Sequence, residues 1–288
     1  MTPKIPIAAI SDEFSSDLAT ALDAMQEIGM SAVELRVVGD KNILDLSDDE
    51  VDRAAALASE RGFRVIAIAS PLFKCVLPDS PAIDARFQHD VFASKHTYED
   101  QARIAERAFS IAKKCGARII RAFSFWRTVD PEKCFEQVVR ELSQLAERAA
   151  VHGLVIGLEN EQACNVATAA EARRVLDRVK HPNLGVVWDP ANAYVSGETP
   201  FPEGYRLLRA GRIVHVHAKD CHVENGAPVW GPLGTQAIDW KGQIGALVKD
   251  GYQGYLSLET HWGGPGGDKL EASRICGWNL RGLASTSE

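Results

Sequence analysis

The chain has 288 residues, of which 45% are hydrophobic and 25% charged, and its formal net charge is −7. This mixture is typical of a folded globular protein. No apolar run approaches the roughly 20 residues of a membrane-spanning helix, and no cluster of Lys and Arg marks a nucleic-acid surface. The six cysteines are scattered without a Cys-x-x-Cys pair, which argues against a zinc ribbon and for a reduced protein of the cytoplasm. We therefore expect neither a nucleic acid nor a membrane as a partner.

Short β-branched runs alternate with longer helical patterns along the chain, which predicts parallel strands joined by helices. The expected strands are Ile5–Ile10, Ala32–Arg36, Arg64–Ala69, Arg118–Phe123, Leu154–Leu158, Leu184–Trp188, Arg212–His217 and Tyr255–Leu258. The expected helices are Leu18–Ile28, Ser47–Arg61, Thr97–Lys114, Asp130–His152, Thr168–Val179, Glu203–Ala210, Trp240–Asp250 and Asp268–Leu283. Ser47 and Glu50 have the spacing of a capping box, Thr97 is expected to cap its helix, and Asp130-Pro131 is expected to begin one as an N-cap and first-turn proline.

These elements form eight strand–helix units with no linker of low complexity between them. A doubly wound open sheet would carry a glycine-rich turn after its first strand, but Ile10–Phe14 contains no glycine. We therefore predict an α/β fold with a single (β/α)₈ TIM barrel spanning residues 1–288. The segment over residues 70–96 exceeds the usual limit of about 12–15 residues for a structureless connection, and we expect it to act as a lid or an oligomer contact.

In such a barrel the active site lies at the carboxyl ends of the strands. Four successive strands end in Glu159, Asp189, His217 and Glu259. Because side chains alternate between faces, an inward Glu159 places Gly157 and Val155 inside the barrel below it. The same parity places Val187 under Asp189, Ser257 under Glu259, and His215 one layer below His217.

Three converging carboxylates would repel one another without a cation. With one neutral imidazole they suit one divalent ion such as Mn²⁺, Co²⁺ or Mg²⁺, whereas Zn²⁺ is less favoured because no thiolate is present. Such an ion polarises a carbonyl and a neighbouring hydroxyl. Glu159 and Glu259 come from separated strands and would stand on opposite faces of a substrate, so that one takes a proton from carbon and the other returns one.

Further side chains at this end of the barrel are candidates for substrate binding: Glu34, Arg36, Lys74, Arg121, Asn192, Lys219 and Trp230. Each has a structural alternative. Glu34 and Arg36 share a face of their strand and could pair with each other. Lys219 could instead be the partner of Glu259 or Asp189.

The remaining candidates are ambiguous for similar reasons. Trp230 is expected either to wall a sugar or to pack within its loop. Arg121 and Lys74 are expected to contact an anion or simply to be solvated. His215 is either an interior histidine whose hydrogen bonds are satisfied or a ligand of a second metal.

Several motifs together resemble the sugar phosphate isomerase/epimerase family, which has the xylose isomerase-like TIM barrel. They are Ala32–Arg36, Leu158–Asn160, Trp188–Asn192, Val214–Asp220, Pro232–Gly234 and Gly254–Glu259. The resemblance implies a divalent ion held by Glu159, Asp189, His217 and Glu259, with the two glutamates as the acid/base pair. Ketohexose 3-epimerases of the family place a histidine and an arginine where this chain has Asn192 and Val223, which argues against a free ketohexose as substrate.

The expected function is a metal-dependent isomerase or epimerase that abstracts a proton beside the carbonyl of a small polyhydroxy-ketone or sugar, phosphorylated or not. The alternative is a dehydratase or lyase that acts on a keto-sugar, keto-glycoside or inosose through the same first step. A sugar sensor without turnover is a third interpretation, and a homo-oligomer is left open.

Overall fold

The computed structural model describes residues 4–87 and 95–285. Eight parallel strands close into a barrel in the order β1-β12-β9-β8-β7-β6-β5-β2. Their bounds are β1 Ile7–Ile10, β2 Ala32–Leu35, β5 Arg64–Leu72, β6 Ile119–Ala122, β7 Val155–Glu159, β8 Leu184–Trp188, β9 Ile213–Ala218 and β12 Leu256–Leu258. The predicted (β/α)₈ fold is confirmed.

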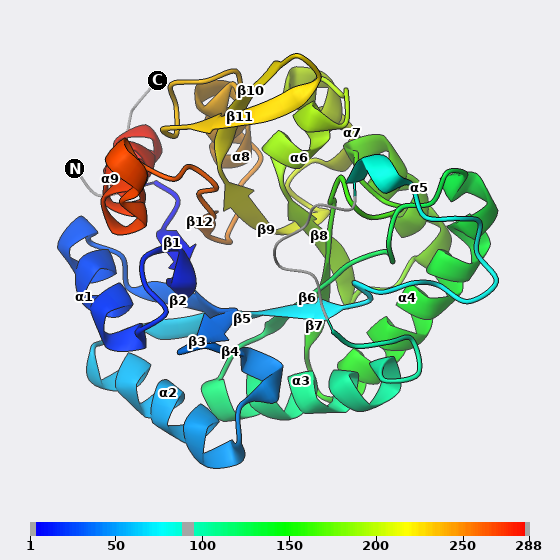
Figure 1. The fold of residues 1–288 in the computed structure, drawn as a ribbon, viewed down its shortest axis with the longest axis horizontal. Coiled ribbons are helices and arrows are strands. Elements are labelled where there is room, and N and C mark those ends of the chain that lie inside the picture. Colours follow the sequence, from blue (N-terminus) through cyan, green and yellow to red (C-terminus); the bar gives the residue numbers. More distant parts are fainter. Residues whose placement is uncertain (1–3, 88–94, 286–288) are drawn as a thin grey trace.

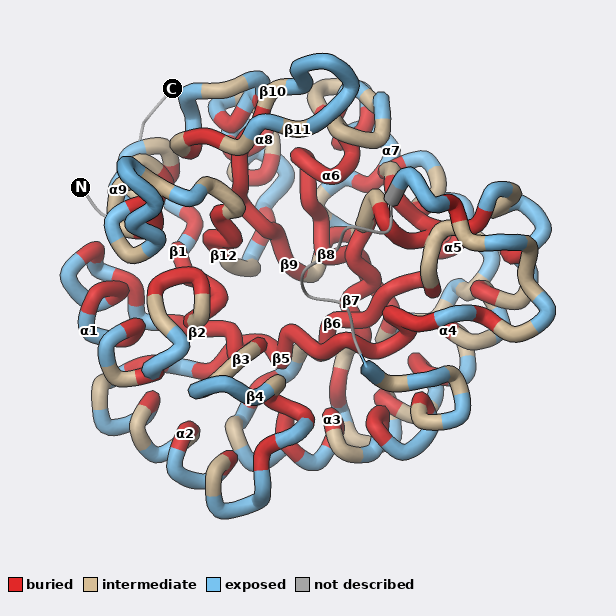
Figure 2. Tube along the Cα trace, in the orientation of Figure 1, coloured by how far each residue is buried: buried red, intermediate tan, exposed pale blue. Residues whose placement is uncertain are grey.

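Helices surround the barrel as a ring (Figure 1). They are α1 Leu18–Ile28, α2 Asp48–Glu60, α3 Gln101–Cys115, α4 Phe135–Val151, α5 Ala169–Val179, α6 Pro190–Val195, α7 Tyr205–Leu208, α8 Trp240–Lys249 and α9 Lys269–Ser285. The barrel strands are buried almost throughout, whereas the helices alternate between buried and exposed turns of chain (Figure 2). None of the helices in the described residues is long and apolar enough to cross a membrane.

Local sequence signals explain most helix ends. The predicted capping box of α2 is present, because Ser47 accepts the N–H of Glu50 and Glu50 accepts the N–H of Ser47. Thr168 and Glu171 make the same pair of bonds at the start of α5. Gly116 ends α3 with a φ of 71°, which glycine adopts without steric cost.

Three helix boundaries differ from the prediction. Thr97 does not cap α3, because it donates to Asp100 within a preceding turn, and the helix begins at Gln101. Asp130 makes no capping bond; Pro131–Cys134 forms a 3₁₀ turn instead, and α4 begins at Phe135. The helix expected over 203–210 is shortened to α7, because the chain before Tyr205 turns through Pro200–Gly204.

Two antiparallel hairpins were not predicted. One pairs β3 Val37–Val38 with β4 Lys41–Asn42, and the other pairs β10 Asp220–Glu224 with β11 Ala227–Gly231. The second hairpin is anchored by the Asp220 carboxylate, which accepts the N–H groups of Cys221, Gly234, Gln236 and Ile238. These four hydrogen bonds fix the position of the hairpin beside the end of β9.

The segment over residues 70–96 begins within the barrel, because β5 continues to Leu72. A 3₁₀ turn follows at Ala85–Phe87. Residues 88–94, at the centre of the expected lid, lie outside the described residues, so the lid or oligomer contact stays a prediction.

Below the site, a strand bulge and two glycines allow valine side chains to fill the barrel interior. The register between β8 and β9 shifts so that Val186 faces Ile213 while Val187 faces His215. Val214, the residue passed over, lies against the positions where side chains on Gly157 and Gly185 would begin. The two glycines therefore make room for valine side chains in the narrow interior.

Candidate metal centre

Four potential ligands meet at the carboxyl ends of neighbouring strands. Glu159 is the last residue of β7, Asp189 follows β8, His217 lies in β9 and Glu259 follows β12. One ligand atom from each lies within 4.8 Å of those of the others, and all four residues are buried. The structure thus brings together the four residues predicted as metal ligands.

His217 lies between the two glutamates. Its Nδ1 atom is 3.2 Å from Glu159 Oε1 and 3.3 Å from Glu259 Oε2. Its other ring nitrogen, Nε2, faces Glu34 Oε2 at 3.4 Å. In the strand order, β8 and β9 separate β7 from β12. Glu159 and Glu259 therefore flank Asp189 and His217, as the sequence suggested for a pair on opposite sides of a substrate.

Three cationic side chains balance these carboxylates. Lys219 Nζ lies 2.8 Å from Asp189 Oδ2 and 3.0 Å from Glu259 Oε2. Arg121 lies 3.2 Å from Glu159 and 3.7 Å from Glu259, and Arg36 lies 3.0 Å from Glu259. The structural alternative for Lys219, a partner of Glu259 and Asp189, is thus what the structure shows.

The electrostatics keep both glutamates ionised. Burial would raise the pKa of Glu159, but His217 and Arg121 outweigh it and lower that pKa. The pKa of Glu259 lies well below its usual value, because Lys219 and His217 overcome the effect of burial. For Asp189 burial prevails over Lys219, with help from the two neighbouring glutamates, and raises the pKa to about 6. A divalent cation bound here would therefore meet carboxylates that are already ionised or close to ionisation.

The donor set fits a divalent ion. Three carboxylates and one imidazole are ligands that Mn²⁺, Co²⁺, Mg²⁺ and Zn²⁺ accept. The Glu159 Oε2 and Asp189 Oδ2 atoms are buried and have cationic neighbours, yet neither accepts a hydrogen bond of good geometry. Buried carboxylate oxygens normally do accept such bonds, so these two have capacity left for a ligand.

The other predicted substrate contacts lie around this cluster with varied neighbours. Lys74 is buried, with its Nζ atom 4.4 Å from the centre of the Phe123 ring and 3.9 Å from Glu161. Trp230 lies in β11, where its ring centre is 4.6 Å from that of His261. Asn192 donates its side-chain amide to the Asn160 carbonyl.

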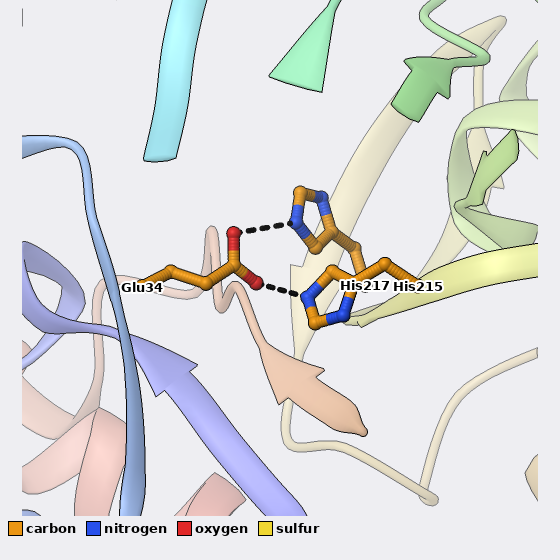
Figure 3. A group of neighbouring side chains, drawn as sticks. All are labelled: Glu34, His215 and His217. Carbon is orange, nitrogen blue, oxygen red and sulfur yellow. Dashed lines mark hydrogen bonds and ion pairs between the residues drawn. The ribbon is translucent and has the colours of Figure 1, made fainter. Parts of the chain in front are cut away.

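Glu34 and Arg36 pair with other residues rather than with each other. Glu34 bridges His215 and His217 (Figure 3). Arg36 bonds Asp12 and Glu13, in the turn after β1, as well as Glu259. His215 is an interior histidine that bonds Glu34, although its Nδ1 atom has no partner among the described residues, and its expected role as a ligand of a second metal stays a prediction.

Sequence reasoning missed two supports of the site. Asn160 accepts the Asp189 N–H and donates to the Asp189 and Ala167 carbonyls, which fixes the backbone at the metal aspartate. Asp12 and Glu13 hold Arg36. A signal existed for each, because both places are polar residues directly after a barrel strand.

A cavity of about 690 Å³ lies at the opposite end of the barrel. It is lined by the amino ends of the strands, among them Arg64, Ile119, Val155 and Tyr255. None of the four ligands borders it. The candidate metal site therefore lies at the carboxyl ends of the strands, which is where the active sites of essentially all characterised barrel enzymes lie.

The structure is a (β/α)₈ barrel with four residues at the carboxyl ends of its strands that could together hold a divalent metal ion. The chain belongs to the xylose isomerase-like TIM barrel family, whose model matches residues 22–276. None of the curated proteins compared matches the sequence.

Solved structures share the fold at low sequence identity. The chain is similar to the IOLI protein with a bound zinc atom, with a TM-score of 0.75 at 18% identity, covering 98% of each chain. It is similar to an apo 3-keto-D-glucoside 4-epimerase from E. coli, with a TM-score of 0.69 at 18% identity, covering 99% of this chain and 100% of the other. It also spans 41% of a xylose isomerase-like TIM barrel/4-hydroxyphenylpyruvate dioxygenase fusion protein, with a TM-score of 0.71, 18% identity and 94% of this chain covered.

Proposed function

We propose that this protein is a metal-dependent isomerase or epimerase that moves a proton beside the carbonyl of a small polyhydroxy-ketone or sugar. One observation carries the proposal: Glu159 and Glu259 stand at the two ends of a row of four adjacent strand ends, with Asp189 and His217 between them. A substrate bound at the centre of this row would have one carboxylate on each side. That is the arrangement that proton transfer on opposite faces of a carbon requires.

The residues that would hold the ion are Glu159, Asp189, His217 and Glu259, and Mn²⁺, Co²⁺ or Mg²⁺ suits them best. A divalent ion bound there would polarise the carbonyl and the adjacent hydroxyl of the substrate and so make the neighbouring C–H more acidic. The zinc atom named with a structure of similar fold supports a bound divalent metal.

We assign separate roles in the reaction to the glutamates, to Arg121 and to Trp230. One glutamate takes the proton from carbon, and the other delivers a proton to the opposite face. Arg121 is held by the Ala69 and Ser70 carbonyls, 3.1 and 3.3 Å from its nitrogens, and it faces both glutamates. We assign it to the negative charge that develops on the substrate oxygens. Trp230 offers its ring as a wall for the sugar.

The test is proton NMR in D₂O of the Mn²⁺-loaded protein with free and phosphorylated ketoses, keto-glycosides and inososes. We expect deuterium to appear beside the carbonyl of a substrate, together with a diastereomer or an aldose/ketose partner. A dehydrated or cleaved product would instead make the protein a lyase that uses the same first step. Absence of exchange with every member of the panel, with metal bound, would contradict the proposal.

Glu159→Gln is the matched variant for this test. It keeps the shape of the side chain and removes the base, so exchange should fall by about 10²–10⁴-fold. Glu106→Gln, on the exposed face of α3, should exchange at the wild-type rate. Undiminished turnover by Glu159→Gln would exclude the assigned base and favour a role in binding alone.

A further inference from the structure

We propose that Glu34 is a positioning residue that sets the orientation of the metal ligand His217, and that His215 holds Glu34 in place. The inference rests on the proposed metal site, and it gives roles to two buried residues that the proton-transfer chemistry does not use. In Figure 3 the Glu34 carboxylate faces both histidine rings, one oxygen to each.

The contact crosses the interior of the barrel. Glu34 lies on β2 and the histidines lie on β9, and β1 and β12 separate these strands in the barrel order. Glu34 Oε2 is 3.4 Å from Nε2 of His217, and Glu34 Oε1 bonds Nε2 of His215. All three side chains are at most 1% exposed. Among the described residues, the two imidazoles are the hydrogen-bond partners of this carboxylate.

Both ring nitrogens of His217 face carboxylates. Nε2 faces Glu34, whereas Nδ1 faces Glu159 and Glu259 at 3.2 and 3.3 Å. Nδ1 is therefore the nitrogen that an ion held by the four ligands would take, and Nε2 would keep its proton and donate it to Glu34. Metal-binding histidines commonly have such a carboxylate on their second nitrogen.

His215 explains why the carboxylate stays in this position. It occupies the second oxygen of Glu34, so the carboxylate cannot rotate away from His217 without losing a bond. The rings of the two histidines are nearly perpendicular, at 87°, with centres 5.5 Å apart. Among the described residues, the buried Nδ1 atom of His215 has no hydrogen-bond partner, so the His215 ring is held by its bond to Glu34.

A second metal ion is the competing interpretation, because Glu34, His215 and His217 also place one ligand atom each within 4.8 Å. The hydrogen-bonded arrangement is favoured because an ion at this place would have to share the His217 ring with the first ion.

The test measures Mn²⁺ binding by calorimetric titration, together with imidazole ¹⁵N NMR of histidine-labelled protein loaded with the diamagnetic ion Mg²⁺. Wild type should bind one ion per chain, and its His217 spectrum should show a proton on Nε2. Glu34→Gln should weaken Mn²⁺ binding by about 10–100-fold and shift the Nε2 resonance of His217, because an amide replaces the carboxylate that accepts its proton. His215→Gln should act in the same direction by a smaller factor.

Glu198→Gln is the control. Glu198 is a half-buried carboxylate at the start of α5, where it accepts the N–H groups of Ala169 and Ala170. The variant removes the same charge away from the metal ligands, and it should keep both the wild-type His217 resonance and an affinity within about threefold, because its charge acts only at longer range.

The outcomes separate this inference from the proposed function. No Mn²⁺, Co²⁺, Mg²⁺ or Zn²⁺ binding by wild type would remove the metal site itself. One ion per wild-type chain, with unchanged affinity and His217 resonance in Glu34→Gln, would overturn the role of Glu34 alone. Two ions per wild-type chain, and one in Glu34→Gln and His215→Gln, would replace the inference with a second metal site.

Discussion

Lys219 supplies the positive charge nearest to the metal ligands in the structure. Its ammonium group is fully buried between Asp189 and Glu259. Removing one partner of such a buried ion pair leaves a charge that is neither solvated nor neutralised, and this is strongly destabilising. The same ammonium and a bound ion would share two carboxylates, so the stability conferred by Lys219 should depend on the metal.

We therefore expect Lys219→Met to lower the free energy of unfolding of the metal-free protein by about 3–5 kcal/mol, as measured by urea denaturation. Saturating Mn²⁺ should restore most of that loss. Lys133→Met provides the control, because Lys133 is 72% exposed in its pair with Asp130 and such pairs contribute at most about 1 kcal/mol. A loss for Lys219→Met as small as that of the control would show that the buried pair does not stabilise the protein.

The sequence predicts which residues reach the site better than it predicts their partners. Strand parity and the carboxyl-end rule were enough to bring Glu159, Asp189, His217 and Glu259 together. Parity could not predict that Glu34 meets His217 across the barrel. That contact depends on the stagger between strands that are not neighbours, which one strand's pattern does not contain.

At the scale of the single element, β7 depends on Gly157 beneath Glu159. A Cβ atom at this position would lie 2.6 Å from Val187 Cγ2 and 3.3 Å from Ile119 Cγ2. The branched valine has little freedom at χ1, so the strand itself would have to move. That movement would shift Glu159 relative to the other three ligands.

Gly157→Ala is accordingly expected to destabilise the protein by about 1–3 kcal/mol and to weaken Mn²⁺ binding. Gly245→Ala is the opposite case, because Gly245 is exposed in α8 and nothing lies within 4 Å of its Cβ position. It should stabilise the protein by about 0.5–1 kcal/mol. Urea denaturation of both variants, with and without Mn²⁺, checks the pair, and equal effects would contradict the packing argument.

The capping box of α2 gives a prediction about pH. Glu50 accepts from Lys41 Nζ and from the Ser47 N–H, and these two bonds lower its pKa from the usual 4.5 to about 2. A lowered carboxyl pKa stabilises the fold above the unfolded value and ceases to do so as the pH falls through the folded value. Wild type should thus exceed Glu50→Gln in stability at pH 7, and the difference should shrink from about pH 4.5 towards pH 2.

Chemical denaturation at several pH values measures that difference, with Glu60→Gln at the other end of α2 as the control. A gap that is constant with pH would mean that Glu50 acts through its shape and not through its charge.

Two structural features that sequence analysis missed, the hairpin of β10 and β11 and the bulge at Val214, differ in whether the sequence carries a signal for them. Asn225-Gly226 lies between β10 and β11 with φ values of 50° and 80°, and an Asn-Gly pair is the strongest short signal for a hairpin. The bulge at Val214 has no such signal. It lies where Val214 packs against Gly157 and Gly185, which belong to other strands of the ring.

At the scale of the molecule, the closed barrel places four adjacent strand ends around one point and buries all four ligands there. An ion that binds this folded arrangement and not the unfolded chain stabilises the fold by mass action, by about 2.7 kcal/mol at a concentration one hundred times its Kd. For a chain of this size that corresponds to a rise in Tm of roughly 5–10 °C. We expect Mn²⁺ to produce this rise in a thermal unfolding experiment and a chelator to reverse it. Asp189→Asn, which removes one ligand, should lose most of the rise. If Mn²⁺, Co²⁺, Mg²⁺ and Zn²⁺ all leave the Tm of wild type unchanged, the four groups do not form a metal site.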